Sequence, residues 1–183
     1  WAQRAAAYRA GLKDFRADIA YGAGERQRLD LILPDGDSKG LVVFVHGGYW
    51  MRFDKSTWTD LAEGARHHGW TVALPSYTLT PAARISDITA EIAAAITNAA
   101  SLVAGPIRLG GHSAGGHLIT RMLCDDSRLE PAVYDRIAGT LSISGLHDLR
   151  PLLKTRMNET LRMTMEEATL ESAALHLPRG HSP

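Results

Sequence analysis

A single serine between two glycines is the residue best placed for covalent chemistry. Ser113 lies between Gly111 and Gly115, after the apolar run 107–109 and before a stretch with helical spacing. A sharp turn from a strand into a helix strains such a serine and leaves no room for a Cβ on its neighbours. The pattern therefore predicts that Ser113 Oγ is a nucleophile. The alternative is a glycine-rich turn in which the serine only caps the helix.

A second glycine motif follows another apolar run. Residues 46–50, His-Gly-Gly-Tyr-Trp, come directly after the run 41–45. Glycines let backbone N–H groups approach a substrate, and the N-terminus of a helix favours a developing negative charge. We predict an oxyanion hole formed by the N–H groups of Gly48, Tyr49 and Ala114. The residues expected to support this site are His46, Gly47, Trp50, Gly111 and Gly115.

Three residues near these motifs each have two interpretations. His46 could be a general base, but we expect it to brace its loop by hydrogen bonds. Trp50 could pack beneath that loop or form an aromatic wall of the acyl pocket. Asp148 follows the run 137–143 and could be a catalytic acid, but a helix cap is favoured. The chain has eight histidines, at positions 46, 67, 68, 112, 117, 147, 176 and 181, and none is predicted to be the base.

The elements that must position these motifs alternate between strand and helix patterns. Alternating polarity over 28–33 predicts a half-buried strand, and apolar runs at 41–45, 71–74, 107–109 and 137–143 predict strands buried on both faces. Helices are expected at 57–68, 85–99 and 116–124, the second with Ile85, Ile88, Ile92 and Ile96 on one face. An edge strand at 18–21 and helical turns at 149–153 and 165–174 complete the pattern. The alternation predicts a doubly wound, mostly parallel α/β sheet with an antiparallel start.

The composition fits one domain, residues 1–183, and excludes several classes of protein. Lys and Arg total 20, as do Asp and Glu, so no basic surface for nucleic acid is expected. No apolar run approaches the ~20 residues that span a bilayer, so no membrane partner is expected. The single Cys124 excludes an internal disulfide and suits a reducing compartment, which predicts a cytoplasmic location. We predict no cofactor and no metal.

Four segments together resemble the α/β-hydrolase superfamily, and within it the kynurenine formamidase-like (arylformamidase-like) esterases. They are residues 46–50, 75–81, 111–117 and 148–152. The form His-Gly-Gly-Tyr-Trp is similar to this group rather than to hormone-sensitive-lipase relatives, which carry His-Gly-Gly-Gly. The resemblance covers about residues 21–177 and implies the α/β-hydrolase fold.

The resemblance also implies a chemistry. It implies a serine hydrolase that cleaves a small ester or an aryl formamide, similar to N-formylkynurenine, through an acyl-serine intermediate. The family's triad runs in the order serine, acid, histidine, and both partners of the serine are expected beyond residue 183. We therefore expect a single domain, truncated at its C-terminus, that lacks the last strands and helices. The alternative is a non-catalytic fragment or pseudoenzyme acting as a binding module, and a homo-oligomer is left open.

Overall fold

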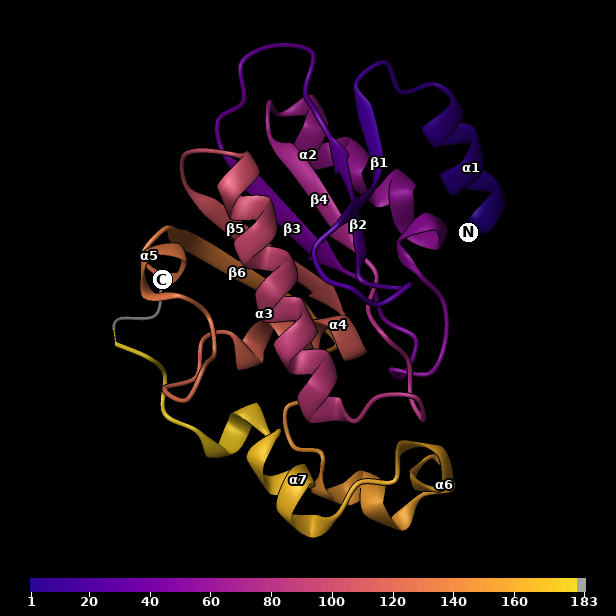
Figure 1. The fold of residues 1–183 in the computed structure, drawn as a ribbon, viewed down its shortest axis with the longest axis vertical. Coiled ribbons are helices and arrows are strands. Elements are labelled where there is room, and N and C mark those ends of the chain that lie inside the picture. Colours follow the sequence, from indigo (N-terminus) through magenta and orange to yellow (C-terminus); the bar gives the residue numbers. More distant parts are fainter. Residues whose placement is uncertain (181–183) are drawn as a thin grey trace.

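A mixed six-stranded sheet organises the chain. The computed structural model describes residues 1–180, and its strands follow the spatial order β1-β2-β4-β3-β5-β6 (Figure 1). The strands are β1 Phe15–Ala20, β2 Arg28–Ile32, β3 Leu41–Val45, β4 Thr71–Pro75, β5 Ile107–His112 and β6 Ile137–Ile143. β1 and β2 pair antiparallel, as do β2 and β4, whereas β3 pairs parallel with β4 and β5, and β5 with β6. This is the predicted α/β-hydrolase sheet with an antiparallel start.

Helices connect the strands and cover the sheet. The α-helices are α1 Ala2–Ala10, α2 Glu63–His67, α3 Ile85–Leu102, α4 Ala114–Arg121, α5 Pro131–Tyr134, α6 Asn158–Leu161 and α7 Met165–Leu170. The 3₁₀ helices are η1 Lys55–Ala62, η2 Arg150–Lys154 and η3 Ala173–Leu175. Figure 1 shows α3 lying obliquely across the front of the sheet, with α6 and α7 beyond its first turn. None of the helices in residues 1–180 combines the length and the apolar character needed to cross a membrane.

The main core lies between the sheet and helices α3 and α4. The predicted apolar face of α3 is fully buried there, with Ile85, Ile88, Ile92 and Ile96 all 0% exposed. Val43 and Val45 face this core from β3, whereas Val42 and Phe44 point to the opposite face of the sheet. The alternation follows from the two-residue period of a strand. The sheet therefore holds β3 and β5, which carry the two motifs, side by side at its centre.

Several predicted boundaries were wrong. β5 runs through Gly110 and Gly111 to His112, and these two glycines let it pack closely against β3, where a Cβ on Gly110 would lie 3.3 Å from Phe44 Cδ2. The expected helix 57–68 begins as η1, whose two threonines and tryptophan have low helix propensity. The expected helix at 116–124 begins earlier, at Ala114, and the helical turn expected at 149–153 is the 3₁₀ helix η2. His181 lies outside the described residues.

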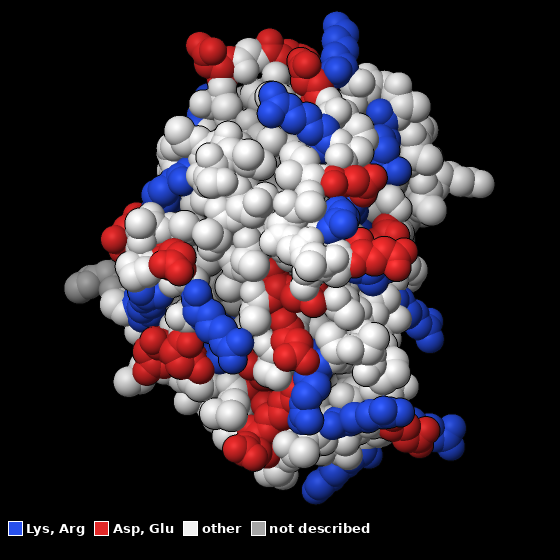
Figure 2. Space-filling model, in the orientation of Figure 1, with Lys and Arg blue, Asp and Glu red and all other residues white. Residues whose placement is uncertain are grey.

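One part of the sheet is only thinly covered. On the face opposite α3 and α4, residues of β3, β5 and β6 line an open, mostly apolar hollow of about 440 Å³. Leu141 and Ile143 of β6 are 63% and 43% exposed there. By contrast, the face drawn in Figure 2 carries acidic and basic side chains mixed together, without a large area of one sign.

Candidate active site

Ser113 has the strained backbone that its motif predicts. It lies between β5 and α4 with φ of 54° and ψ of −116°, a region that residues with a Cβ rarely occupy. Its N–H donates to Ile143 O of the neighbouring strand at 2.8 Å, which fixes the turn. Such a conformation costs about 1–3 kcal/mol and persists only where the surrounding structure imposes it.

The glycines beside Ser113 are sterically required. A Cβ on Gly111 would lie 2.4 Å from the carbonyl oxygen of Gly115. A Cβ on Gly115 would lie 2.0 Å from the carbonyl oxygen of Val45. Both obstacles are backbone atoms, which cannot rotate away as a side chain can. Close contact of α4 with β5 depends on Gly111, and its close contact with β3 depends on Gly115.

The second motif closes directly over Ser113. A Cβ on Gly47 would lie 3.1 Å from Ser113 Cβ, so residues 46–50 approach the nucleophile with bare backbone. Gly48, Tyr49 and Trp50 all have positive φ, at 121°, 57° and 59°. In the described residues, no hydrogen bond uses the N–H of Gly48 or Tyr49. Ala114 is the first residue of α4, so its N–H has no partner within the helix.

His46 is held inside this loop. Its ring is 1% exposed, and its Nδ1 donates to Gly47 O at 2.7 Å. Tyr77 stacks on the ring with centroids 4.4 Å apart and donates its O–H to His46 O at 3.1 Å. Burial lowers the pKa of His46 to about 4, so the ring is neutral at physiological pH. These contacts brace the loop.

Trp50 connects the loop to α4 and to the segment after η2. Its ring is 0% exposed and meets His117 edge-on, with centroids 5.3 Å apart. His117 Nε2 donates to Glu171 O at 2.7 Å, and burial lowers the pKa of this histidine to about 4. Trp50 therefore packs beneath the loop and does not form an exposed wall. Neutral His117 ties three separate parts of the chain together.

No described histidine forms a hydrogen bond with the nucleophile. Within residues 1–180, the hydrogen bonds of histidine rings go to other groups, and none joins Ser113 Oγ. His147 Nε2 lies 3.3 Å from Ser142 Oγ, and burial lowers the pKa of that ring. The ring of His112 lies 5.9 Å from that of Trp58. A general base works best with a pKa near the working pH, so the buried rings of His46 and His117 are also poorly tuned for the task.

Asp148 is engaged with its own loop. Its carboxylate accepts from the Arg150 backbone N–H at 3.1 Å and from the Arg150 guanidinium at 2.9 and 2.7 Å. These hydrogen bonds lower the pKa of Asp148 to about 2. The side chain thus closes a local turn onto Arg150 before η2. The expected helix cap is not formed, because the N-cap residue of η2 is Leu149 and no side chain caps that helix. Among the hydrogen bonds of residues 1–180, none joins it to a histidine.

Aromatic side chains lie on the loop that carries Gly47 and beside His112. Tyr49 and Phe53 are 50% and 43% exposed on the loop that closes over the serine. Phe53 meets Trp58 edge-on at 6.0 Å, and Trp58 in turn contacts His112. A separate charged cleft of about 430 Å³, between α3, α4 and α7, does not include Ser113.

A sequence profile described as "Alpha/beta hydrolase family" matches residues 42–181. The chain belongs to the α/β hydrolase family. This hydrolase is similar to the kynurenine formamidase of Salmo salar, with 32% identity over 92% of the chain and 58% of the relative. The kynurenine formamidase of Danio rerio is 33% identical over 87% of the chain and 56% of its own length. The α/β hydrolase chain therefore spans less than two thirds of these relatives.

Solved structures agree on the α/β hydrolase fold. A protein from Silicibacter sp. tm1040, provisionally named a thioesterase, is 51% identical with a TM-score of 0.95, over 98% of this chain and 69% of that one. Esterase B from Lactobacillus rhamnosis is 16% identical with a TM-score of 0.72, over 96% of this chain and 67% of that one. At this low identity the second likeness shows the fold alone.

The sequence did not indicate how the segment after η2 is anchored. Glu167 and Glu171 are both 6% exposed, and their carboxylates accept hydrogen bonds from residues of α3 or beside it. Arg84 donates to Glu167, and Thr89 donates to Glu171 at 2.6 Å. The only sign of this anchoring in the sequence is a pair of glutamates four residues apart, which share a helical face. Such pairs usually face solvent, so burial was not expected. These contacts hold the segment over α3.

Proposed function

We propose that this chain carries the serine nucleophile and the oxyanion donors of a serine hydrolase for small esters or aryl formamides. The observation that supports it most directly is the left-handed Ser113 at the β5–α4 turn, with the backbone of Gly47 against it. Strained serines at such turns expose Oγ for attack. The similarity to two kynurenine formamidases adds the formamide class to the proposal.

In the proposed reaction, Ser113 Oγ attacks the carbonyl carbon and forms an acyl-serine. The carbonyl oxygen becomes an oxyanion, which accepts hydrogen bonds from the N–H groups of Gly48, Tyr49 and Ala114. The leaving alcohol or amine departs with a proton, and water releases the acyl group. We assign the nucleophile and the oxyanion donors to these residues and assign no base, since no described histidine forms a hydrogen bond with Ser113 Oγ.

The exposed rings of Tyr49 and Phe53 favour an aromatic group on the substrate. A flat ring beside Ser113 would bury apolar surface against them, at about 25 cal/mol per Å². Aryl formamides and aryl esters both meet this requirement. The cytoplasmic location and the homo-oligomer remain predictions from the sequence.

A binding module without catalysis is the second candidate. It is favoured because no histidine among residues 1–180 forms a hydrogen bond with Ser113 Oγ. Oxyanion donors without a base still accelerate acyl transfer about 10³–10⁴-fold over the reaction in water. Slow acylation of Ser113 would therefore support the hydrolase over the binding module.

The test is covalent labelling with p-nitrophenyl acetate, read by peptide mass spectrometry. Wild type should gain one acetyl group at Ser113, and Ser113→Ala should lose it. Ser144→Ala is the matched control, because Ser144 also follows a parallel strand, has φ of 53° and is exposed. Equal labelling of wild type and Ser113→Ala would refute the proposal. Saturable binding of an aryl formamide without acylation would favour the binding module.

A further inference from the structure

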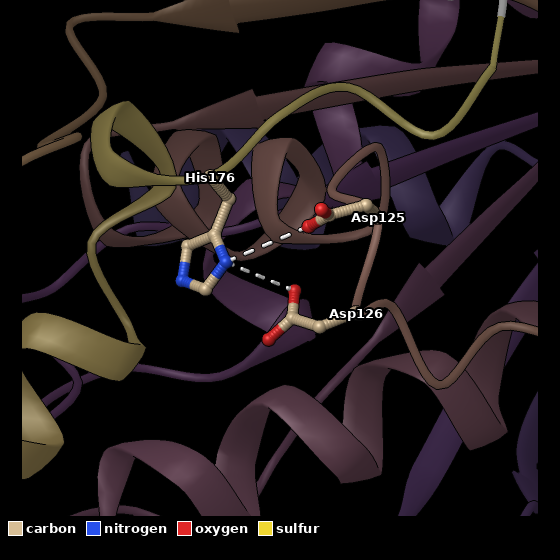
Figure 3. A group of neighbouring side chains, drawn as sticks. All are labelled: Asp125, Asp126 and His176. Atoms are coloured by element: carbon tan, nitrogen blue, oxygen red, sulfur yellow. Dashed lines mark ion pairs between the residues drawn. The ribbon is translucent and has the colours of Figure 1, made fainter.

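Three side chains capable of binding metal meet at the far end of α4 from Ser113. Asp125 and Asp126 follow α4, and His176 follows η3. One ligand atom from each residue lies within 4.8 Å of the other two. Figure 3 shows Nδ1 of His176 facing both carboxylates. Because α4 has eight residues, the cluster is about 12 Å along the helix from the candidate active site.

One ring nitrogen of His176 is held by the backbone. Its Nε2 lies 2.8 Å from the carbonyl oxygen of Leu170, which can only accept a hydrogen bond. Nε2 therefore carries a proton, and Nδ1 is the ring nitrogen that faces the two carboxylates. A metal ion bound to Nδ1 would take the place of a proton there. Metal-bound histidines commonly donate their other N–H to a backbone carbonyl in this way.

The distances within the cluster are those of ion pairs, and they also suit ligand atoms that share one metal ion. His176 Nδ1 lies 3.5 Å from Asp126 Oδ1 and 3.7 Å from Asp125 Oδ1. Direct N–H···O hydrogen bonds are about 2.7–3.2 Å long. Tetrahedral zinc with bonds of about 2.0–2.2 Å places neighbouring ligand atoms about 3.3–3.6 Å apart. The ligand atoms of Asp125 and Asp126 lie within 4.8 Å of each other, and the side chain of Asp125, 51% exposed, has room to adjust.

The surroundings hold the ligands in place. Arg121 donates to both oxygens of Asp126, at 2.9 and 2.8 Å, and leaves a second lone pair on each oxygen. The Asp125 N–H donates to Leu177 O at 2.9 Å, which joins the two segments that carry the ligands. Cys124 is buried and its Sγ points to Thr120 O, so the thiol is not part of the cluster. Hydrogen-bonded carboxylates of this kind are common around bound metals.

We propose that Asp125, Asp126 and His176 form a structural site for a divalent transition metal, with Zn²⁺ as the reference ion. The ion would join the loop after α4 to the segment after η3. One nitrogen and two carboxylate oxygens match the ligands that zinc uses in proteins. The site is independent of ester or formamide hydrolysis. The sequence predicted no metal because His176 is distant in the chain from Asp125 and Asp126.

The test is calorimetric titration of the metal-free chain with ZnCl₂ at pH 7.5. We expect one Zn²⁺ per chain, with affinity at least about tenfold lower in His176→Ala and in Asp125→Asn. Thermal unfolding should occur at a higher temperature as zinc is added to wild type, and EDTA should reverse this shift. If His176→Ala does not fold, the affinity of Asp125→Asn for zinc still tests the proposed site.

The control is the double variant His67→Ala/His68→Ala. These two histidines end α2 and are exposed, so they represent adventitious zinc binding by surface imidazoles. Their replacement should leave the titration unchanged. The proposal is wrong if wild type binds no zinc, or if Asp125→Asn and His176→Ala bind it as tightly as wild type. An imidazolium held by two aspartates without a metal would give the first of these results.

Discussion

Gly115→Ala should destabilise the fold sharply, although alanine is the better helix former. Gly115 lies in the first turn of α4, where the substitution alone would stabilise the helix by up to about 1 kcal/mol. The new Cβ, however, would lie 2.0 Å from Val45 O, 2.6 Å from Val45 C and 2.7 Å from His46 O. Carbon and oxygen without a bond between them rarely approach closer than about 3.2 Å. The helix and β3 must therefore separate by roughly 1 Å.

Such a separation opens the packed interface between α4 and the sheet. Inserting one methylene into a well-packed core costs about 1–3 kcal/mol, and more where the backbone must move. We expect Gly115→Ala to lower the free energy of unfolding by at least about 3 kcal/mol. Urea denaturation followed by circular dichroism measures the change.

Gly64→Ala is the matched control for this experiment. Gly64 lies in α2, and a Cβ there would meet no atom within 4 Å. The same substitution should stabilise the chain by about 0.5–1 kcal/mol at this position. If Gly115→Ala unfolds within 0.5 kcal/mol of wild type, the steric account of the turn is refuted.

Three further perturbations test the interior of the chain. Tyr77→Phe keeps the ring stack but removes the O–H donor to His46 O, and should cost about 1–2 kcal/mol in urea denaturation; no loss would contradict the bracing role. Burial lowers the pKa of His46 and of His117 to about 4, below the unfolded value near 6.5, so the unfolded chain binds more protons between these pH values. The free energy of unfolding should therefore keep its full value above pH 6.5 and fall by up to about 3 kcal/mol per ring as the pH drops to 4. An unchanged urea midpoint over that range would contradict this expectation. Glu167→Gln weakens a buried acceptor and should cost about 1–2 kcal/mol, whereas the exposed neighbour Glu166→Gln should stay within 0.5 kcal/mol, and equal effects would contradict the anchoring role.

The sequence predicted those features that depend on local pattern. The isoleucines of α3 repeat at helical spacing, and that spacing alone identified the face that the structure buries completely. The apolar run 41–45 likewise predicted the central strand β3. In both cases the pattern of apolar residues along a single element is sufficient, because that pattern indicates whether one or both of its faces are buried.

The sequence could not predict contacts that depend on the meeting of distant segments. His117 donates to the backbone carbonyl of Glu171, and a carbonyl leaves no signature in the residue type. The same holds for His176 and the two aspartates after α4, which adjoin only through the path of the chain. The left-handed conformation of Trp50 was also not predicted, since bulky residues rarely adopt positive φ.

The pairing of β3 with β5 also affects when the candidate site can form. Val45 and Gly111 are opposite each other in parallel strands, although β4 and all of α3 lie between them in the chain. Closing so long a loop has an entropic cost before any contact compensates for it, so parallel pairs of this kind form slowly. The contact of Gly115 with the Val45 carbonyl, which helps to hold the turn, exists only after that pairing. We expect Ser113 to behave as an ordinary serine during most of folding and to acquire its strained geometry in the last steps.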